Sequence, residues 1–188
     1  RPDDALAALA RARAAAPGAA RPGVLTGQRL HRQGRHADAL QAWDELRRSN
    51  PGAFLLVAAD YAASARACGR QDYAQQALAE ALHTMPAVEL LQALEHVDAA
   101  NAEQRLPRLL AHLQQHPSLS AAQLLLDVPH ALWTDAAWVA LRDAVARAAK
   151  PLQRYRCAAC GFEAQHYFWQ CPGCLSWDSY PPQRMDAL

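Results

Sequence analysis

The sequence predicts a mostly α-helical protein that ends in a small metal-binding module. Three observations lead to this prediction. Alanine, the best intrinsic helix former, dominates the apolar residues, and aromatic residues make up only 7% of the chain, which argues against a β-rich fold. Prolines recur at intervals near 34 residues, and two Cys-x-x-Cys pairs lie close together near the end of the chain.

The prolines mark an internal repeat. Four of them each end a predicted helical stretch, at spacings of 34, 35 and 31 residues: Pro17, Pro51, Pro86 and Pro117. Small or apolar residues recur at fixed distances before the first three prolines: Ala5, Ala39 and Ala74; Leu9, Trp43 and Leu78; Ala12, Leu46 and Ala81. This is the tetratricopeptide pattern, in which each repeat is a pair of antiparallel helices and successive pairs stack into a superhelix.

The repeat predicts the positions of the helices. A second helix at 3–16, whose own first helix is missing, is followed by helices at 24–33, 36–49, 54–68, 71–84, 87–99, 102–115, 119–127 and 134–149. Gly34 and Gly69 are expected to turn the chain within a repeat. The last two helices cap the stack, and Lys150-Pro151 ends it. We therefore expect a helical domain at 1–150, the C-terminal part of a longer array, and a separate module at 151–188.

Repeat arrays of this kind bind partners on a concave surface lined mainly by the first helix of each repeat. The residues expected there are Gln28, Arg29, Arg32 and Tyr61. The large apolar side chains at the repeat positions are expected to form the core instead: Trp43, Leu46, Phe54, Leu78 and Leu82.

The metal module is predicted from four cysteines, Cys157, Cys160, Cys171 and Cys174. Two residues between the cysteines of a pair let both sulfur atoms reach one ion from a single tight turn. Two such turns supply four thiolates at tetrahedral corners, a geometry that zinc and iron accept. The short spacing and the ordinary composition of the rest of the chain favour one metal ion over two disulfides or two redox dithiols.

Other candidate sites are weaker. His112 and His116 are four residues apart on a predicted helix but have no third ligand, so we interpret them as a solvated polar face; His166 is not needed in a site that four thiolates fill. Cys68 is expected to be a small buried hydrophobe. No nucleophile with a base and no glycine-rich phosphate loop is found, so the sequence does not predict an enzyme.

The tail and repeats together resemble the lipopolysaccharide assembly protein B family. The resemblance is carried by Tyr155-Arg156-Cys157, Cys160-Gly161-Phe162, Trp169-x-Cys171-Pro172-x-Cys174 and Trp177, with the repeats before them. It implies a rubredoxin-type or zinc-ribbon metal knuckle in which Cys157, Cys160, Cys171 and Cys174 hold one iron or zinc ion. Rubredoxins proper usually place glycine after the second knuckle, where this sequence has Leu175, so we interpret the metal as structural.

The same resemblance implies a function. The family acts as a non-catalytic adaptor that helps a membrane-bound ATP-dependent protease degrade the deacetylase committed to lipid A, and it thereby restrains lipopolysaccharide synthesis. It implies a location on the cytoplasmic side of the inner membrane, with an N-terminal transmembrane anchor in the full-length protein. No stretch of about 18 apolar residues is present, so this fragment is expected to be soluble. A homo-oligomer is compatible with the sequence.

Two alternatives remain open at this point. One is a repeat scaffold whose zinc ribbon binds nucleic acid or another protein, and the other is a rubredoxin-like electron carrier. Nucleic acid is disfavoured because the whole chain carries a net charge of only +1. Residues 151–188 are neutral, with three basic and three acidic side chains: Arg154, Arg156 and Arg184 against Glu163, Asp178 and Asp186.

Overall fold

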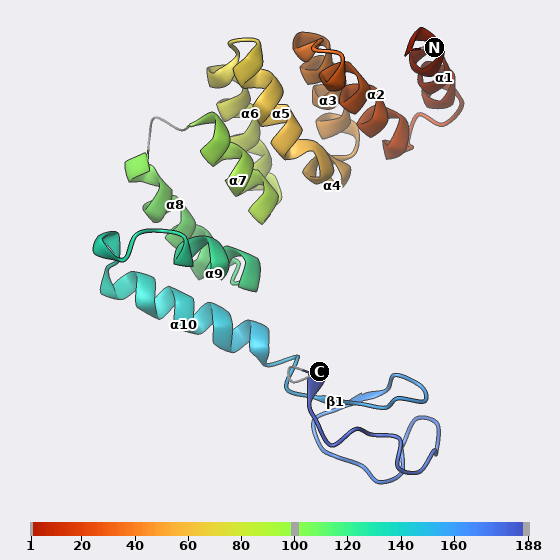
Figure 1. The fold of residues 1–188 in the computed structure, drawn as a ribbon, viewed down its shortest axis with the longest axis vertical. Helices are drawn as coiled ribbons and strands as arrows, with labels where there is room; N and C mark the ends of the chain where they lie inside the picture. The colour runs from red at the N-terminus through yellow and green to blue at the C-terminus, as the bar shows by residue number, and fades with distance from the viewer. Residues whose placement is uncertain (1, 99–101, 186–188) are drawn as a thin grey trace. The chain divides into compact units, whose positions relative to one another are not determined.

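The computed structural model describes residues 2–98 and 102–185, and its described part is helical as far as Ala149 (Figure 1). The mostly α-helical class is confirmed. The predicted end of one helix at Ala99 and the last three residues of the tail lie outside the described residues. The chain divides into two compact units, Arg1–Arg105 and Leu106–Leu188, and each is described by itself.

The first unit is a series of helices joined by short turns, at positions close to those that the repeat predicts. They are α1 (Pro2–Ala15), α2 (Ala20–Arg32), α3 (His36–Ser49), α4 (Pro51–Phe54), α5 (Ala58–Ala67), α6 (Gln71–Thr84) and α7 (Val88–Val97). The helix predicted at 54–68 is interrupted, because a 3-10 turn at Leu55–Val57 separates α4 from α5. Pro51 occupies the first turn of α4. A backbone N–H at this position has no acceptor within the helix, so proline loses no hydrogen bond there.

Two glycines make the turns within the repeats, as predicted. Gly34 and Gly69 have φ angles of +73° and +69°, which place them in the left-handed region that glycine adopts without strain. The following residue closes each turn with a backbone hydrogen bond to the preceding helix: Arg35 N–H donates to Leu30 O at 2.9 Å and Arg70 N–H to Ala65 O at 2.8 Å. The same sequence feature therefore produces the same helix end in both repeats.

The core of the first unit lies where the repeat helices meet. The predicted core residues Trp43, Leu46, Phe54 and Leu78 are buried, and Leu82 is partly buried against them. Helix α2 packs along α3 and also contacts α5, and α5 in turn packs against α6 and α7. Helices α2 and α5 therefore each contact both their own partner helix and the next repeat.

The prediction that Tyr61 lies on the concave surface is wrong. Tyr61 in α5 is fully buried, and its hydroxyl donates a hydrogen bond of 2.9 Å to Asp44 Oδ1 in α3. Tyr73 in α6 donates to the other oxygen of Asp44 at 2.8 Å. Burial, together with the Asp44 carboxylate, raises the pKa of Tyr61 above its ordinary value. Tyr61 thus joins helices inside the core and is unavailable to a partner.

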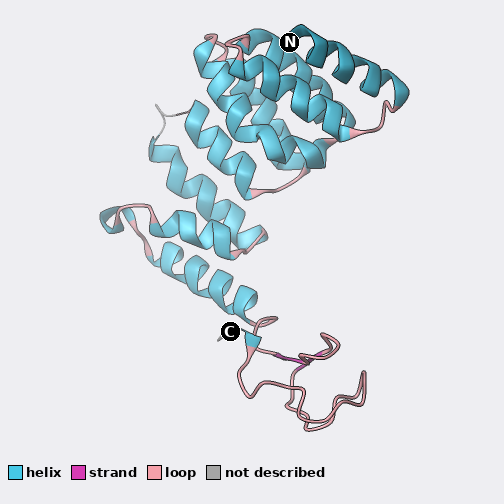
Figure 2. Cartoon of the chain, turned by 45° about the vertical axis from the view of Figure 1, so that its right-hand side comes forward, coloured by secondary structure: helices cyan, strands magenta, loops and turns pink. Residues whose placement is uncertain are grey.

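The second unit combines helices with the tail, which consists mainly of loops (Figure 2). Helix α8 (Ala102–Gln115) crosses the boundary between the units; α9 (Leu119–Leu126), a 3-10 turn (His130–Leu132) and α10 (Asp135–Ala149) follow. Ser118 caps α9 by accepting a hydrogen bond from Ala121 N–H at 3.1 Å. In the tail, strands β1 (Tyr155–Arg156) and β2 (Glu163–Ala164) pair antiparallel, with Tyr155 opposite Ala164. Among the described helices, none is both long and apolar enough to cross a membrane.

The prediction of a solvated His112 is also wrong. His112 is 9% exposed on the inner side of α8, and its ring centroid lies 5.6 Å from that of His116, which is exposed. Burial lowers the pKa of His112, and the neighbouring His116 lowers it further. Cys68 is half-buried at the edge of the core of the first unit.

Candidate metal centre

The first cysteine pair lies in a tight turn after β1. Gly161 N–H donates to Cys157 O at 2.9 Å, and Cys157 N–H donates to Phe162 O at 3.0 Å. These two bonds fold the chain back on itself between the cysteines of the pair. Gly161 closes the turn with a φ of +78°, which explains why glycine follows Cys160.

The second pair repeats this turn with leucine at the position that closes it. Leu175 N–H donates to Cys171 O at 2.8 Å, and Cys171 N–H donates to Ser176 O at 2.9 Å. Leu175 therefore occupies the position that Gly161 holds in the first turn, with a φ of +62°. Its side chain is 67% exposed, so little packing compensates for the unfavourable backbone conformation.

Replacing Leu175 with glycine is expected to stabilise the metal-loaded tail by about 0.5–1 kcal/mol. Relief of the left-handed backbone exceeds the extra conformational entropy that glycine loses on folding. Thermal unfolding of the tail, followed by its backbone amide NMR signals, measures the change. The matched variant Gly161→Leu introduces the same strain in the first turn and should destabilise it. A less stable Leu175→Gly protein would show instead that the leucine side chain makes contacts worth more than the strain.

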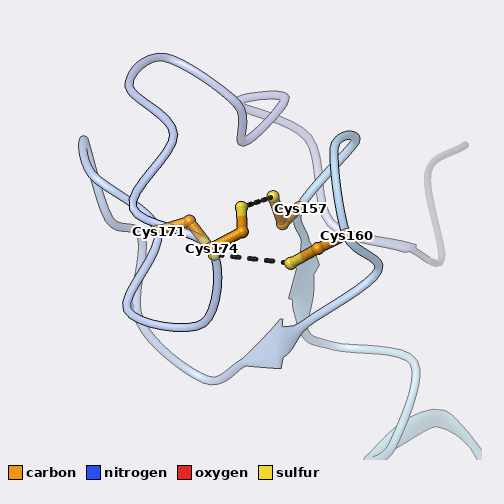
Figure 3. Close-up of side chains that lie close together, drawn as sticks. All are labelled: Cys157, Cys160, Cys171 and Cys174. Carbon is orange, nitrogen blue, oxygen red and sulfur yellow. Dashed lines mark hydrogen bonds between the residues drawn. The ribbon is translucent and has the colours of Figure 1, made fainter.

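The two turns bring the four sulfur atoms together (Figure 3). Cys157 Sγ lies 3.8 Å from Cys174 Sγ, and Cys160 Sγ lies 3.7 Å from Cys171 Sγ, so each contact joins one turn to the other. All four sulfur atoms lie within 4.8 Å of one another. A tetrahedral zinc ion about 2.3 Å from each sulfur requires separations of about 3.8 Å, whereas a disulfide requires about 2.05 Å. The cysteines are arranged to bind one metal ion.

The protonation of the thiols supports the same conclusion. The contact with the Ser179 hydroxyl lowers the pKa of Cys157 to about 6, because that hydroxyl can donate to the thiolate. The pKa of Cys160 is raised to about 12: the Phe162 N–H favours its thiolate, but the contacts with Cys174 and the other thiols outweigh that bond. Four thiols in so small a space cannot all ionise together unless a cation neutralises them.

The buried part of the tail is small and consists largely of these cysteines. Its buried residues are Cys157, Cys171 and Tyr180, with Tyr155, Ala164 and Tyr167 partly buried around them. The aromatic residues most prominent in the sequence are more exposed: Phe162 is 44% exposed, Trp169 67% and Trp177 68%. Tyr180 and Ser179 also lie beside the sulfur atoms but were not expected there from the sequence. Neither residue belongs to a recognisable motif, so no sequence signal pointed to them.

The remaining predicted surface residues lie together in the first unit. Gln28, Arg29 and Arg32 line a groove of about 580 Å³ between α2 and α1, and Leu9 contributes to its apolar side. In the repeat formed by α2 and α3, the first helix α2 packs along α3, and Trp43 of α3 is fully buried. Leu9, at the same repeat position, is only partly buried.

Comparisons with known proteins give a match for the tail and another along almost the whole chain. Residues 155–182 match the family described as the rubredoxin metal binding domain. The chain is 25% identical over 196 residues to lipopolysaccharide assembly protein B of Escherichia coli strain K12, and proteins of the same name from strains O6:H1 and O157:H7 match equally well. Each match covers 99% of this chain and 50% of the relative, so the chain spans about half the length of these curated relatives. The resemblance stated from the sequence is confirmed.

Proposed function

From the resemblance to lipopolysaccharide assembly protein B along almost the whole chain, we propose that this protein is a non-catalytic adaptor in lipopolysaccharide assembly. The match of residues 155–182 to a metal-binding family is the observation that carries the proposal, because repeat helices alone occur in many unrelated proteins. The resemblance seen in the sequence rests on the repeats together with this tail.

The adaptor mechanism that we propose is the one that the family resemblance implies. The protein promotes degradation of the deacetylase committed to lipid A by a membrane-bound ATP-dependent protease. The repeats and the metal module each make modest contacts with partners, and joining them in one chain raises the overall affinity through effective concentration. The full-length protein is held at the cytoplasmic side of the inner membrane by an anchor outside the present chain.

The metal has a structural role in this proposal. Cys157, Cys160, Cys171 and Cys174 hold one zinc or iron ion, which joins the two turns and stabilises a module at 151–188. The ion supplies four metal–sulfur bonds in place of an apolar core. The residues of the chain orient these sulfur atoms and keep two of them, those of Cys157 and Cys171, away from water.

Binding of nucleic acid is not favoured by the surface of the tail. Arg156 forms an ion pair of 2.8 Å with Glu163, and Arg154 lies 3.9 Å from the same carboxylate. The guanidinium of Arg184 lies 5.8 Å from the centre of the Tyr155 ring. The arginines of the described tail therefore have partners within the tail, which leaves no cluster of free cations for phosphates.

Complementation tests the proposed function. Cells depleted of their own copy receive a membrane-anchored full-length protein with Cys157→Ser and Cys160→Ser, and the level of the lipid A deacetylase is measured. We expect the deacetylase to accumulate and growth to suffer. The matched control is Cys68→Ser, a cysteine outside the cluster, which should restore normal turnover. Normal turnover with the double variant, shown to lack metal, would overturn the adaptor mechanism as proposed.

A further inference from the structure

The metal site has to stabilise a large negative charge. Four thiolates around a divalent ion leave two negative charges on the centre. The arginines of the described tail make their closest charged and ring contacts elsewhere: Arg154 and Arg156 share the carboxylate of Glu163, and Arg184 lies over Tyr155. Hydrogen-bond donors close to the sulfur atoms are the remaining means of stabilising this charge.

Ser179 is placed to be such a donor. Its Oγ lies 3.2 Å from Cys157 Sγ, and Cys157 is only 1% exposed, so water does not replace this contact. Ala158 N–H donates to Ser179 O at 2.7 Å, which fixes the backbone of Ser179 against the first cysteine turn. The serine is thus held beside the sulfur atom by its main chain.

The hydrogen bonds around Ser179 differ between the thiol and the thiolate. In the structure the Cys157 thiol donates to Ser179 Oγ, and the Ser179 hydroxyl donates to Ser176 O at 3.2 Å. A metal-bound Cys157 has no proton, so the Ser179 hydroxyl has to turn toward its sulfur to keep the contact. Ser176 O still accepts Cys171 N–H at 2.9 Å and is not left without a donor. The turn of the hydroxyl therefore leaves no buried polar group unpaired.

A second serine makes the same contact at the surface. Ser176 Oγ lies 3.3 Å from Cys174 Sγ, and Cys174 is exposed. Tyr180 differs, because its hydroxyl lies 3.8 Å from Cys171 Sγ and donates to Phe162 O at 3.3 Å. Tyr180 is therefore farther from its sulfur atom than either serine hydroxyl is from its own.

We propose that Ser179 and Ser176 are positioning residues of the metal site, whose hydroxyls donate to the metal-bound thiolates of Cys157 and Cys174 and strengthen retention of the ion. Ser179 makes the larger contribution because its bond is shielded from water, whereas water can replace the hydroxyl of Ser176. The inference rests on the proposed metal ligation by the four cysteines.

Competition for Zn²⁺ with a chelator, on the whole chain, tests the proposal. Ser179→Ala should weaken Zn²⁺ binding by about 10- to 100-fold, and Ser176→Ala by less. Ser179→Thr keeps the hydroxyl and should restore most of the affinity. Ser120→Ala in α9 makes the same chemical change at an exposed serine and should have no effect. In the Co²⁺-loaded protein, Ser179→Ala should also shift the sulfur-to-metal absorption bands, which a purely structural defect would not do.

The outcomes distinguish failure of the proposed metal ligation by the cysteines from failure of the proposed role of the serine hydroxyls. If the unaltered chain binds no Zn²⁺, the proposed ligation fails. If it binds Zn²⁺ and Ser179→Ala binds equally well with unchanged Co²⁺ bands, only the role of the hydroxyls is overturned. Should Ser179→Ala not fold, Ser176→Ala decides: a measurable loss of affinity supports the proposal, and an unchanged affinity overturns it.

Discussion

Removal of the bound metal is expected to unfold the tail and to leave the helices before Lys150 folded. The reason is the composition of the buried part of the tail, where two of the three buried residues, Cys157 and Cys171, are proposed ligands and Tyr180 is the third. Metal binding to small zinc modules contributes about 10–16 kcal/mol, far more than one buried tyrosine supplies. Chelation should collapse the dispersion of the amide NMR signals of 155–182, while circular dichroism at 222 nm changes little.

Three controls accompany this experiment. Addition of Zn²⁺ after chelation should restore the dispersed signals, and the variant Cys171→Ser should show the collapsed spectrum without any chelator. Cys68→Ser should behave as the unaltered chain, because Cys68 lies in the first unit and outside the cluster. Dispersed tail signals in the metal-free protein would show that the tail folds without the metal and contradict this prediction.

Most of the helix positions could be predicted because the repeat combines several signals with one period. Proline, glycine and alanine each recur in phase, and local backbone preferences of this kind operate without tertiary contacts. The cysteine turns were predictable for the same reason, since two intervening residues restrict the geometry of each pair. The break between α4 and α5 was not, because Leu55–Val57 carries no helix-breaking residue.

The features that the sequence did not predict concern polar side chains, and two of these, Tyr61 and Ser179, are held by partners distant in the chain. Tyr61 is buried because its hydroxyl reaches Asp44, 17 residues earlier in the chain. His112 is buried although a histidine in that pattern is usually solvated. Ser179 lies beside Cys157 because Ala158 binds its backbone, a contact across 21 residues. Long-range hydrogen bonds of this kind leave no periodic signal in the sequence, so only the structure locates them.

The second large effect is expected at Trp43, which fills the space between α3 and α2. Trp43 is fully buried, and its ring packs against Gly27 so closely that a Cβ atom on Gly27 would overlap it. Trp43→Ala should therefore destabilise the first unit by about 3–5 kcal/mol, through lost burial and the cavity left behind. Urea unfolding followed by circular dichroism measures this loss. The matched control Trp138→Ala removes a tryptophan that is 55% exposed and should cost much less.

A second variant tests whether the close contact between Trp43 and Gly27 contributes to the stability of the first unit. Gly27→Ala alone should destabilise the first unit by about 1–3 kcal/mol, because the ring of Trp43 has to move although alanine is the better helix former. In a Trp43→Ala background the added methyl group enters the cavity, so the same change should be neutral or stabilising. The two substitutions are therefore expected to be strongly coupled. Additive effects would mean that the ring and Gly27 are not in contact, and that the loss at Trp43 reflects burial of area alone.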